Sequence, residues 1–149
     1  MTKKKQIIGV IEKIIIAGSN GKKKEVFARI DTGADYSSID KTIARKIGYS
    51  ETINEFHDKL IKCGKKIFEM KRVDKEEYFS GIPFFKTCFK IKSVHGFSYR
   101  PVVNILFNIK GMEIKTKATI IDRSQLKYPV IIGRKDLSGF LVNIISEKM

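Results

Sequence analysis

The chain is poor in the residues that cross-link a protein or anchor it in a membrane. Its 149 residues include two cysteines, three prolines and no tryptophan. Two cysteines cannot build a disulfide framework, which favours a reducing cytoplasm. No apolar run approaches the ~18 residues of a membrane span, and Gly9, Glu12 and Lys13 interrupt the apolar start that a secretion signal needs. We therefore expect a cytoplasmic protein with no membrane partner.

Acidic residues are also scarce, since 16 Asp and Glu stand against 30 Lys and Arg and give a net charge of +14 at pH 7. This surplus suits an anionic partner, yet it serves solubility equally well. The lysines are spread along the chain, and the aromatic residues, 10% of the total, do not cluster with them. Stacking on bases would require such clusters, so nucleic acid is the least favoured partner.

Apolar and polar residues alternate near both ends of the chain, as is typical of β-strands. At the start, Gln6–Ala17 and Glu25–Asp31 predict a hairpin around a turn at Gly18–Gly21. Later, Val103–Ile109 and Ile114–Ile120 predict a second hairpin with one solvent-exposed face. The composition is 42% hydrophobic and 31% charged, which excludes a wholly disordered chain, and the length predicts a single domain.

The middle of the chain is harder to interpret. Asp40 is a suitable N-cap for a short helix that runs to Ile47 and is closed by Gly48. Helical spacing of apolar residues then predicts a second helix over Glu51–Phe68. We expect residues 1–149 to form one mainly β domain with one or two helices, interrupted by a poorly patterned insertion at about 49–92.

Two short motifs carry the chemistry. Asp31-Thr32-Gly33 stands at the end of an alternating strand, so its carboxylate is lifted onto a loop. Glycine there permits a tight turn, and the threonine hydroxyl is able to orient a neighbouring group. The second motif is a short apolar strand at 128–133 that ends in glycine and is followed by Arg134. In unrelated proteins the first motif also occurs as an ordinary turn and the second as an ordinary strand.

Together, and in this order, the motifs resemble those of retropepsins, in Ile30–Asp35 and Val130–Arg134. More closely, Arg29–Ala34 with Ser37-Ser38 resembles a bacterial and archaeal retropepsin-like family whose members often carry the name ATP-dependent zinc protease. Residues 119–134 and 139–142 resemble the carboxy-terminal block of that family. The resemblance leaves the middle of the chain uncovered beyond the first helix.

The resemblance implies a closed β-barrel of the acid protease fold that works as an obligate homodimer. It implies an aspartic endopeptidase in which water is activated between the Asp31 carboxylates of two chains, with Thr32 and Gly33 completing each catalytic loop. No cofactor and no metal are implied. The residues themselves agree, because the spacing of His57, Cys63, Cys88 and His95 fits no familiar zinc site.

The same resemblance assigns further site residues. Ala34 and Asp35 would bind the substrate main chain, and Gly133 and Arg134 would support the site, with Asp35 and Arg134 as a partly buried ion pair. A solvated surface aspartate is the alternative for Asp35. A flap hairpin over the substrate would have its tip at 93–97 and use Val94, His95 and Gly96, although an ordinary exposed loop fits these residues equally well.

Two further expectations concern the surroundings of the site. Dimer contacts would involve the Asp31 loop, the flap tip and the terminal strands, including Phe140–Asn143. Ser37 and Ser38 lack the setting of a serine nucleophile, so we expect them to hydrogen-bond the loop around Asp31.

The alternatives to a peptidase are a catalytically idle domain that binds an extended peptide and a basic nucleic-acid-binding barrel. An intact Asp31-Thr32-Gly33 favours catalysis over the idle domain, since a binder has no need of the acid. The substrate itself is not specified by the sequence. An association of the family with glutamate-ligating enzymes would point to acidic or modified peptides, which suit a basic surface.

Overall fold

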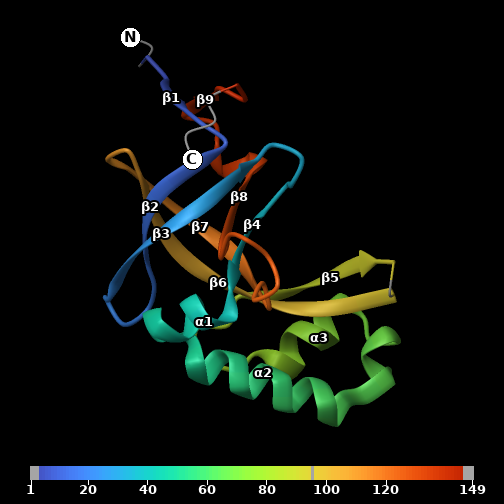
Figure 1. Cartoon of the computed structure of the whole chain (residues 1–149). Coiled ribbons are helices and arrows are strands. Elements are labelled where there is room, and N and C mark those ends of the chain that lie inside the picture. Colours follow the sequence, from blue (N-terminus) through green and yellow to red (C-terminus); the bar gives the residue numbers. More distant parts are fainter. Residues whose placement is uncertain (1–3, 95, 146–149) are drawn as a thin grey trace.

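The computed structural model describes residues 4–94 and 96–145 (Figure 1). Within these residues the strands are β1 (Gln6–Ile8), β2 (Ile11–Ala17), β3 (Lys23–Asp31), β4 (Ser37–Asp40), β5 (Thr87–Ser93), β6 (Gly96–Ile109), β7 (Met112–Ile121), β8 (Val130–Gly133) and β9 (Phe140–Val142). The α-helices are α1 (Lys41–Ala44), α2 (Ser50–Cys63) and α3 (Arg72–Phe79).

Six of the strands close into a barrel. Their order is β2-β3-β8-β4-β7-β6, and β6 pairs back onto β2 through Ile15 and Asn108. β5 extends this sheet along the outer part of β6, forming a hairpin that projects from the barrel (Figure 1). The expected mainly β closed barrel is therefore confirmed.

Alternating side chains fill the barrel as the sequence predicts. On β3, Ala28 and Ile30 are buried, whereas Phe27 is 54% exposed. On β6, the alternate residues from Val103 to Ile109 are at most 4% exposed. Burial of these β-branched and aromatic side chains supplies the main driving force for the fold.

A helical insertion joins β4 to β5 and covers one end of the barrel (Figure 1). Its helices pack under the β5–β6 hairpin and form a second apolar cluster around Phe56, Phe79 and Tyr99. Asp40 caps α1 as predicted, its side chain accepting a hydrogen bond from the Thr42 amide. The last residues of the expected insertion, from Thr87, belong instead to the hairpin.

The structure differs from the sequence prediction in three elements. Gln6–Ala17 is two strands, because the chain breaks at Gly9 and Val10. The helix expected over Glu51–Phe68 ends at Cys63, where Gly64 adopts a positive φ of 55° and a tighter helical turn follows. α3 was not predicted, since only its last residue, Phe79, is buried and its other side chains are mostly polar.

Among the described residues, no helix is long and apolar enough to cross a membrane.

Candidate active site

Asp31 ends β3 inside the barrel sheet. β3 runs parallel to β8, which places Asp31 directly beside Gly133. The loop then turns tightly, because the Ala34 amide donates to the Asp31 carbonyl at 3.2 Å. The Gly33 amide donates to Asp31 Oδ1 at 3.0 Å, so the loop fixes one oxygen of the carboxylate. The half-buried Asp31 is thus held at the point where the strand becomes a loop.

The turn that follows β8 holds this loop through its main chain. The Arg134 amide donates to the Ala34 carbonyl at 2.6 Å, and the Lys135 amide donates to the Asp35 carbonyl at 3.1 Å. A side chain at Gly133 would lie only 2.4 Å from the Tyr36 carbonyl carbon. Glycine is therefore required for the close approach of β8 to the Asp31 loop.

Asp35 and Arg134 form the ion pair that the sequence predicted, with Arg134 Nη2 donating to Asp35 Oδ1. The expectation that this pair is partly buried is wrong for a single chain, because the side chains are 54% and 64% exposed. Water screens exposed pairs, so the pair contributes about 0–1 kcal/mol to the stability of one chain. The position of the loop depends mainly on the main-chain hydrogen bonds from Arg134 and Lys135.

The two serines after the loop have separate roles. Ser37 is fully buried, accepts a hydrogen bond from the Gly133 amide at 3.0 Å and donates to Asp136 Oδ2 at 2.5 Å. It therefore supports the site through β8. Ser38 instead shares a hydrogen bond with Thr119 of β7 at 2.7 Å, away from the loop.

The hairpin of β5 and β6 turns where the sequence predicted a flap. Ser93 pairs with Gly96, whose positive φ of 107° suits the turn. Val94 is 96% exposed at the tip, while His95 lies outside the described residues. The base of the hairpin reaches the Asp31 loop, because the rings of Phe89 and Tyr36 lie 4.9 Å apart.

Beside Tyr36 the surface is hollowed in two adjoining places, of about 410 and 460 Å³. We call this hollow the loop-side groove. It is lined by residues of the active-site loop, the hairpin, the insertion and the barrel, including Tyr36, Phe89, Arg72, Lys90, Lys117 and Lys135. Lys135 Nζ lies 4.2 Å from the centre of the Tyr36 ring. No pattern in the sequence indicates this groove.

A second feature that the sequence did not assign is a clamp on the segment 122–129 before β8. Asp40 accepts a hydrogen bond from the Arg123 amide at 2.7 Å and its own amide donates to the Pro129 carbonyl at 2.8 Å. The Arg123 side chain is 8% exposed and donates to the Tyr128 carbonyl at 3.0 Å. Burial lowers the pKa of Arg123, and Asp40 and Asp31 are among the charges acting on it.

The remaining candidate ligands that the structure describes, His57, Cys63 and Cys88, belong to no metal-binding group. Among the described residues, no three His, Cys, Asp or Glu side chains lie together as metal ligands would. Cys63 and Cys88 are free thiols that pack against the second apolar cluster, and burial raises the pKa of Cys88.

The fold has counterparts among solved structures. A Legionella pneumophila protein of unknown function, Lpg0085, matches with a TM-score of 0.51 and 17% identity, covering 95% of this chain and 94% of that one. The Simian Foamy Virus (mac) protease matches at 0.47 and 12%, covering 85% and 90%. The EIAV protease complexed with the inhibitor HBY-793 matches at 0.49 and 16%, covering 90% and 91%.

No curated protein sequence matches the chain. A family model described as the retropepsin-like aspartic endopeptidase RimB matches residues 7–146, nearly the whole sequence. That span includes both motifs and the insertion between them. In the fold the two motifs lie side by side, since Asp31 pairs with Gly133. The chain belongs to the RimB-like family of retropepsin-like aspartic endopeptidases.

Proposed function

We propose that the chain is an aspartic endopeptidase whose active unit is a homodimer, with one Asp31 from each chain. The observation that carries the proposal is the Asp31-Thr32-Gly33 loop itself. One oxygen of its carboxylate is fixed by the Gly33 amide, and the turn after the neighbouring strand β8 holds the loop by its main chain. A carboxylate in a rigid loop suits general acid–base work on a peptide bond.

The chemistry needs two such carboxylates. Two carboxyl groups a few ångströms apart cannot both ionise, so they share one proton. The ionised member takes a proton from water, which attacks the scissile carbonyl carbon. The protonated member polarises the carbonyl oxygen, and the leaving nitrogen is then protonated as the C–N bond breaks. Thr32 would brace the pair across the two-fold axis.

Two features of the single chain support a second copy as the source of the other carboxylate. The nearby acids are engaged, since Asp35 pairs with Arg134 and Asp136 accepts from Ser37. The paired terminal strands β1 and β9, together with the turn that follows β9, also leave apolar side chains open to solvent. These are Ile7, Leu141, Ile144 and Ile145, each between 54% and 85% exposed.

The substrate would lie between the Asp31 loop and the hairpin. Ala34 and Asp35 would contact its main chain, and Val94, His95 and Gly96 would cover it. In the adjoining loop-side groove, Arg72, Lys75, Lys90, Lys117 and Lys135 outnumber Glu76 and Asp136. Charge complementarity therefore supports acidic peptides as the substrate class.

The test is cleavage of a peptide library by purified protein and its Asp31→Asn variant. An amide cannot act as the base, so we expect the variant to lose activity while keeping its fold. Asp58→Asn, on the exposed side of α2, is the matched control and should keep activity. Activity per chain should also rise with protein concentration, because each chain supplies half of the site.

Retained cleavage by Asp31→Asn would refute the aspartic mechanism. Full activity in a protein that sediments as a monomer would refute the dimer. Activity that EDTA removes and metal restores would favour a metallopeptidase. A protein that binds the peptides without cleaving them would be the idle binding domain.

A further inference from the structure

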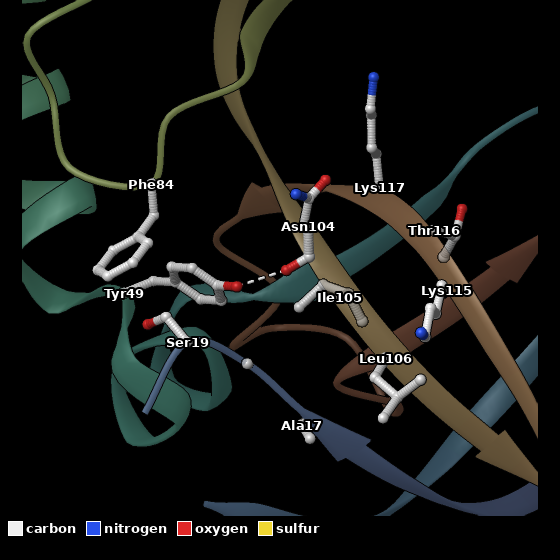
Figure 2. A pocket seen from close by; sticks show the side chains of 11 residues that line it. Ala17, Ser19, Tyr49, Phe84, Asn104, Ile105, Leu106, Lys115, Thr116 and Lys117 are labelled. Atoms are coloured by element: carbon white, nitrogen blue, oxygen red, sulfur yellow. Dashed lines mark hydrogen bonds between the residues drawn. The ribbon is translucent and has the colours of Figure 1, made fainter. Parts of the chain in front are cut away.

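The outer face of the barrel carries a hollow of about 570 Å³ that the proposed chemistry does not use (Figure 2). It lies where β2, β6 and β7 meet the loop before β5. Ala17 and Leu106 form its apolar floor, Tyr49 and Phe84 form one wall, and Lys115 and Lys117 stand on the opposite side. We call this hollow the outer groove.

The wall of the outer groove is rigidly built. The Tyr49 side chain is 3% exposed, and its hydroxyl donates to the Asn104 carbonyl of β6 (Figure 2). Burial raises the pKa of Tyr49, so the hydroxyl stays protonated as a donor. Any side chain at Gly18, directly after β2, would lie 2.7 Å from the Tyr49 ring, so the chain packs closely against this wall at that point. The groove is thus preformed.

Phe84 is held over the outer groove in an uncommon conformation. Its φ is positive, at 61°, which a bulky residue rarely adopts, and its side chain is nevertheless 57% exposed. Its ring meets Tyr49 edge-on at 6.0 Å. The preceding carbonyl, of Pro83, accepts a hydrogen bond from the buried Thr52 at 2.7 Å and so fixes the loop. An exposed aromatic held in a strained conformation points to a function.

Charge indicates what the groove would accept. Among the described residues, neither Lys115 nor Lys117 makes an ion pair. An apolar floor beside two such lysines suits a polypeptide segment with an apolar side chain next to acidic ones. A second copy of this chain fits less well, because each copy carries a net charge of +14.

The outer groove also adjoins the proposed substrate site. Thr116 and Lys117 line both the outer groove and the loop-side groove next to Tyr36. A substrate that leaves the site past Tyr36 would therefore meet Lys117 and then the wall of Phe84. We propose that the outer groove docks a remote segment of the protein substrate, which inserts an apolar side chain beside Phe84 and sets acidic residues on Lys115 and Lys117. This inference rests on the proposed function.

The test uses a fluorescein-labelled peptide in which one phenylalanine is flanked by glutamates. Binding is measured by fluorescence anisotropy on the full chain carrying Asp31→Asn, so that no cleavage interferes. Phe84→Gly removes the ring without backbone strain and should weaken binding about tenfold, as expected for loss of an aromatic anchor. Replacing the phenylalanine of the peptide with alanine should have a similar effect. Phe27→Ala is the matched control, since Phe27 is 54% exposed on another strand.

A second arm tests the charges and the location. Lys115→Glu with Lys117→Glu should weaken binding about tenfold, whereas Lys66→Glu, on the insertion, should not. Amide NMR shifts on adding the peptide should include residues 17–19, 104–106 and 115–117. Equal binding by Phe84→Gly, shifts confined to residues 31–36, or self-association that Phe84→Gly abolishes would each overturn the docking role. Because binding is scored without catalysis, these outcomes are independent of whether Asp31→Asn loses cleavage.

Discussion

Replacing Asp40 with alanine tests the clamp that joins β4, the insertion and the segment before β8. Asp40 is 6% exposed, and each of its carboxylate oxygens accepts a main-chain hydrogen bond. Oδ1 accepts from the Arg123 amide at 2.7 Å, and Oδ2 accepts from the Thr42 amide at 3.0 Å at the start of α1. Alanine removes both acceptors and leaves the donors in place.

The expected loss has two parts. Removing an N-cap acceptor costs about 1 kcal/mol. Leaving the buried Arg123 amide without a partner costs about 1–3 kcal/mol. We therefore expect Asp40→Ala to lower the free energy of unfolding by about 2–4 kcal/mol. Asp40→Asn keeps one carbonyl acceptor and should fall between alanine and the unmodified chain.

Urea unfolding measures this loss. With a slope of about 2 kcal/mol/M, the midpoint for Asp40→Ala should fall by roughly 1–2 M while the slope is unchanged. Asp122→Ala is the matched control. Asp122 also accepts an amide hydrogen bond, from Ser124 at 2.9 Å, but in an exposed position where water can replace it. A midpoint for Asp40→Ala no lower than that of Asp122→Ala would refute the clamp.

Three further predictions concern the site and its surroundings. Gly133→Ala should destabilise the fold by about 3 kcal/mol or more in urea unfolding, because its Cβ would lie 2.4 Å from Tyr36 main chain that cannot move aside. Arg134→Lys should change the stability of a single chain by less than about 1 kcal/mol, since its pair with Asp35 is exposed; a larger loss in the same assay would contradict this. Cys88 should react slowly with iodoacetamide in the folded chain and rapidly in urea, as read by mass spectrometry, because burial raises its pKa and keeps the thiol protonated. Since the unfolded thiol ionises at lower pH, the stability due to Cys88 should decline as pH rises above its ordinary pKa, and pH-independent unfolding there would contradict the shift.

The strands could be predicted because their signal is local, whereas closure into a barrel was implied only by the family resemblance. Alternation on β3 and β6 reports directly which side chains face the core, and both strands lie where it indicated. The Asp31 motif and the Gly133 strand were recognised as short motifs of a known family, and the structure sets them side by side in one register. The break between β1 and β2 at Gly9 was not predicted, because the β-branched residues on both sides of it resemble one continuous strand.

The insertion and the grooves could not be predicted because they depend on distant partners. α3 has one buried residue, Phe79, so no periodic apolar stripe marks it. Arg123 lies in a polar segment of the sequence, and nothing there predicts that it is buried. Its burial follows from its contacts with Tyr128 and Asp40 in the fold. The burial of the Asp35–Arg134 pair was wrongly predicted because a sequence shows which charges can pair but not how much water reaches them.

The way the Asp31 loop is held explains why a substitution that displaces its backbone should lower the free energy of unfolding much more than a substitution of its exposed side chains. Its supports are amide donors of β8 and the turn after it, directed at carbonyls of the loop and at the buried hydroxyl of Ser37. These bonds need Gly133 to approach closely but need no particular side chain on the surface. The exposed charges around them, Asp35, Arg134 and Lys135, are therefore free to serve the substrate or a second chain without setting the position of the carboxylate. In the proposed peptidase, such a division would let one rigid loop accept a change of specificity while its acid stays where the chemistry requires it.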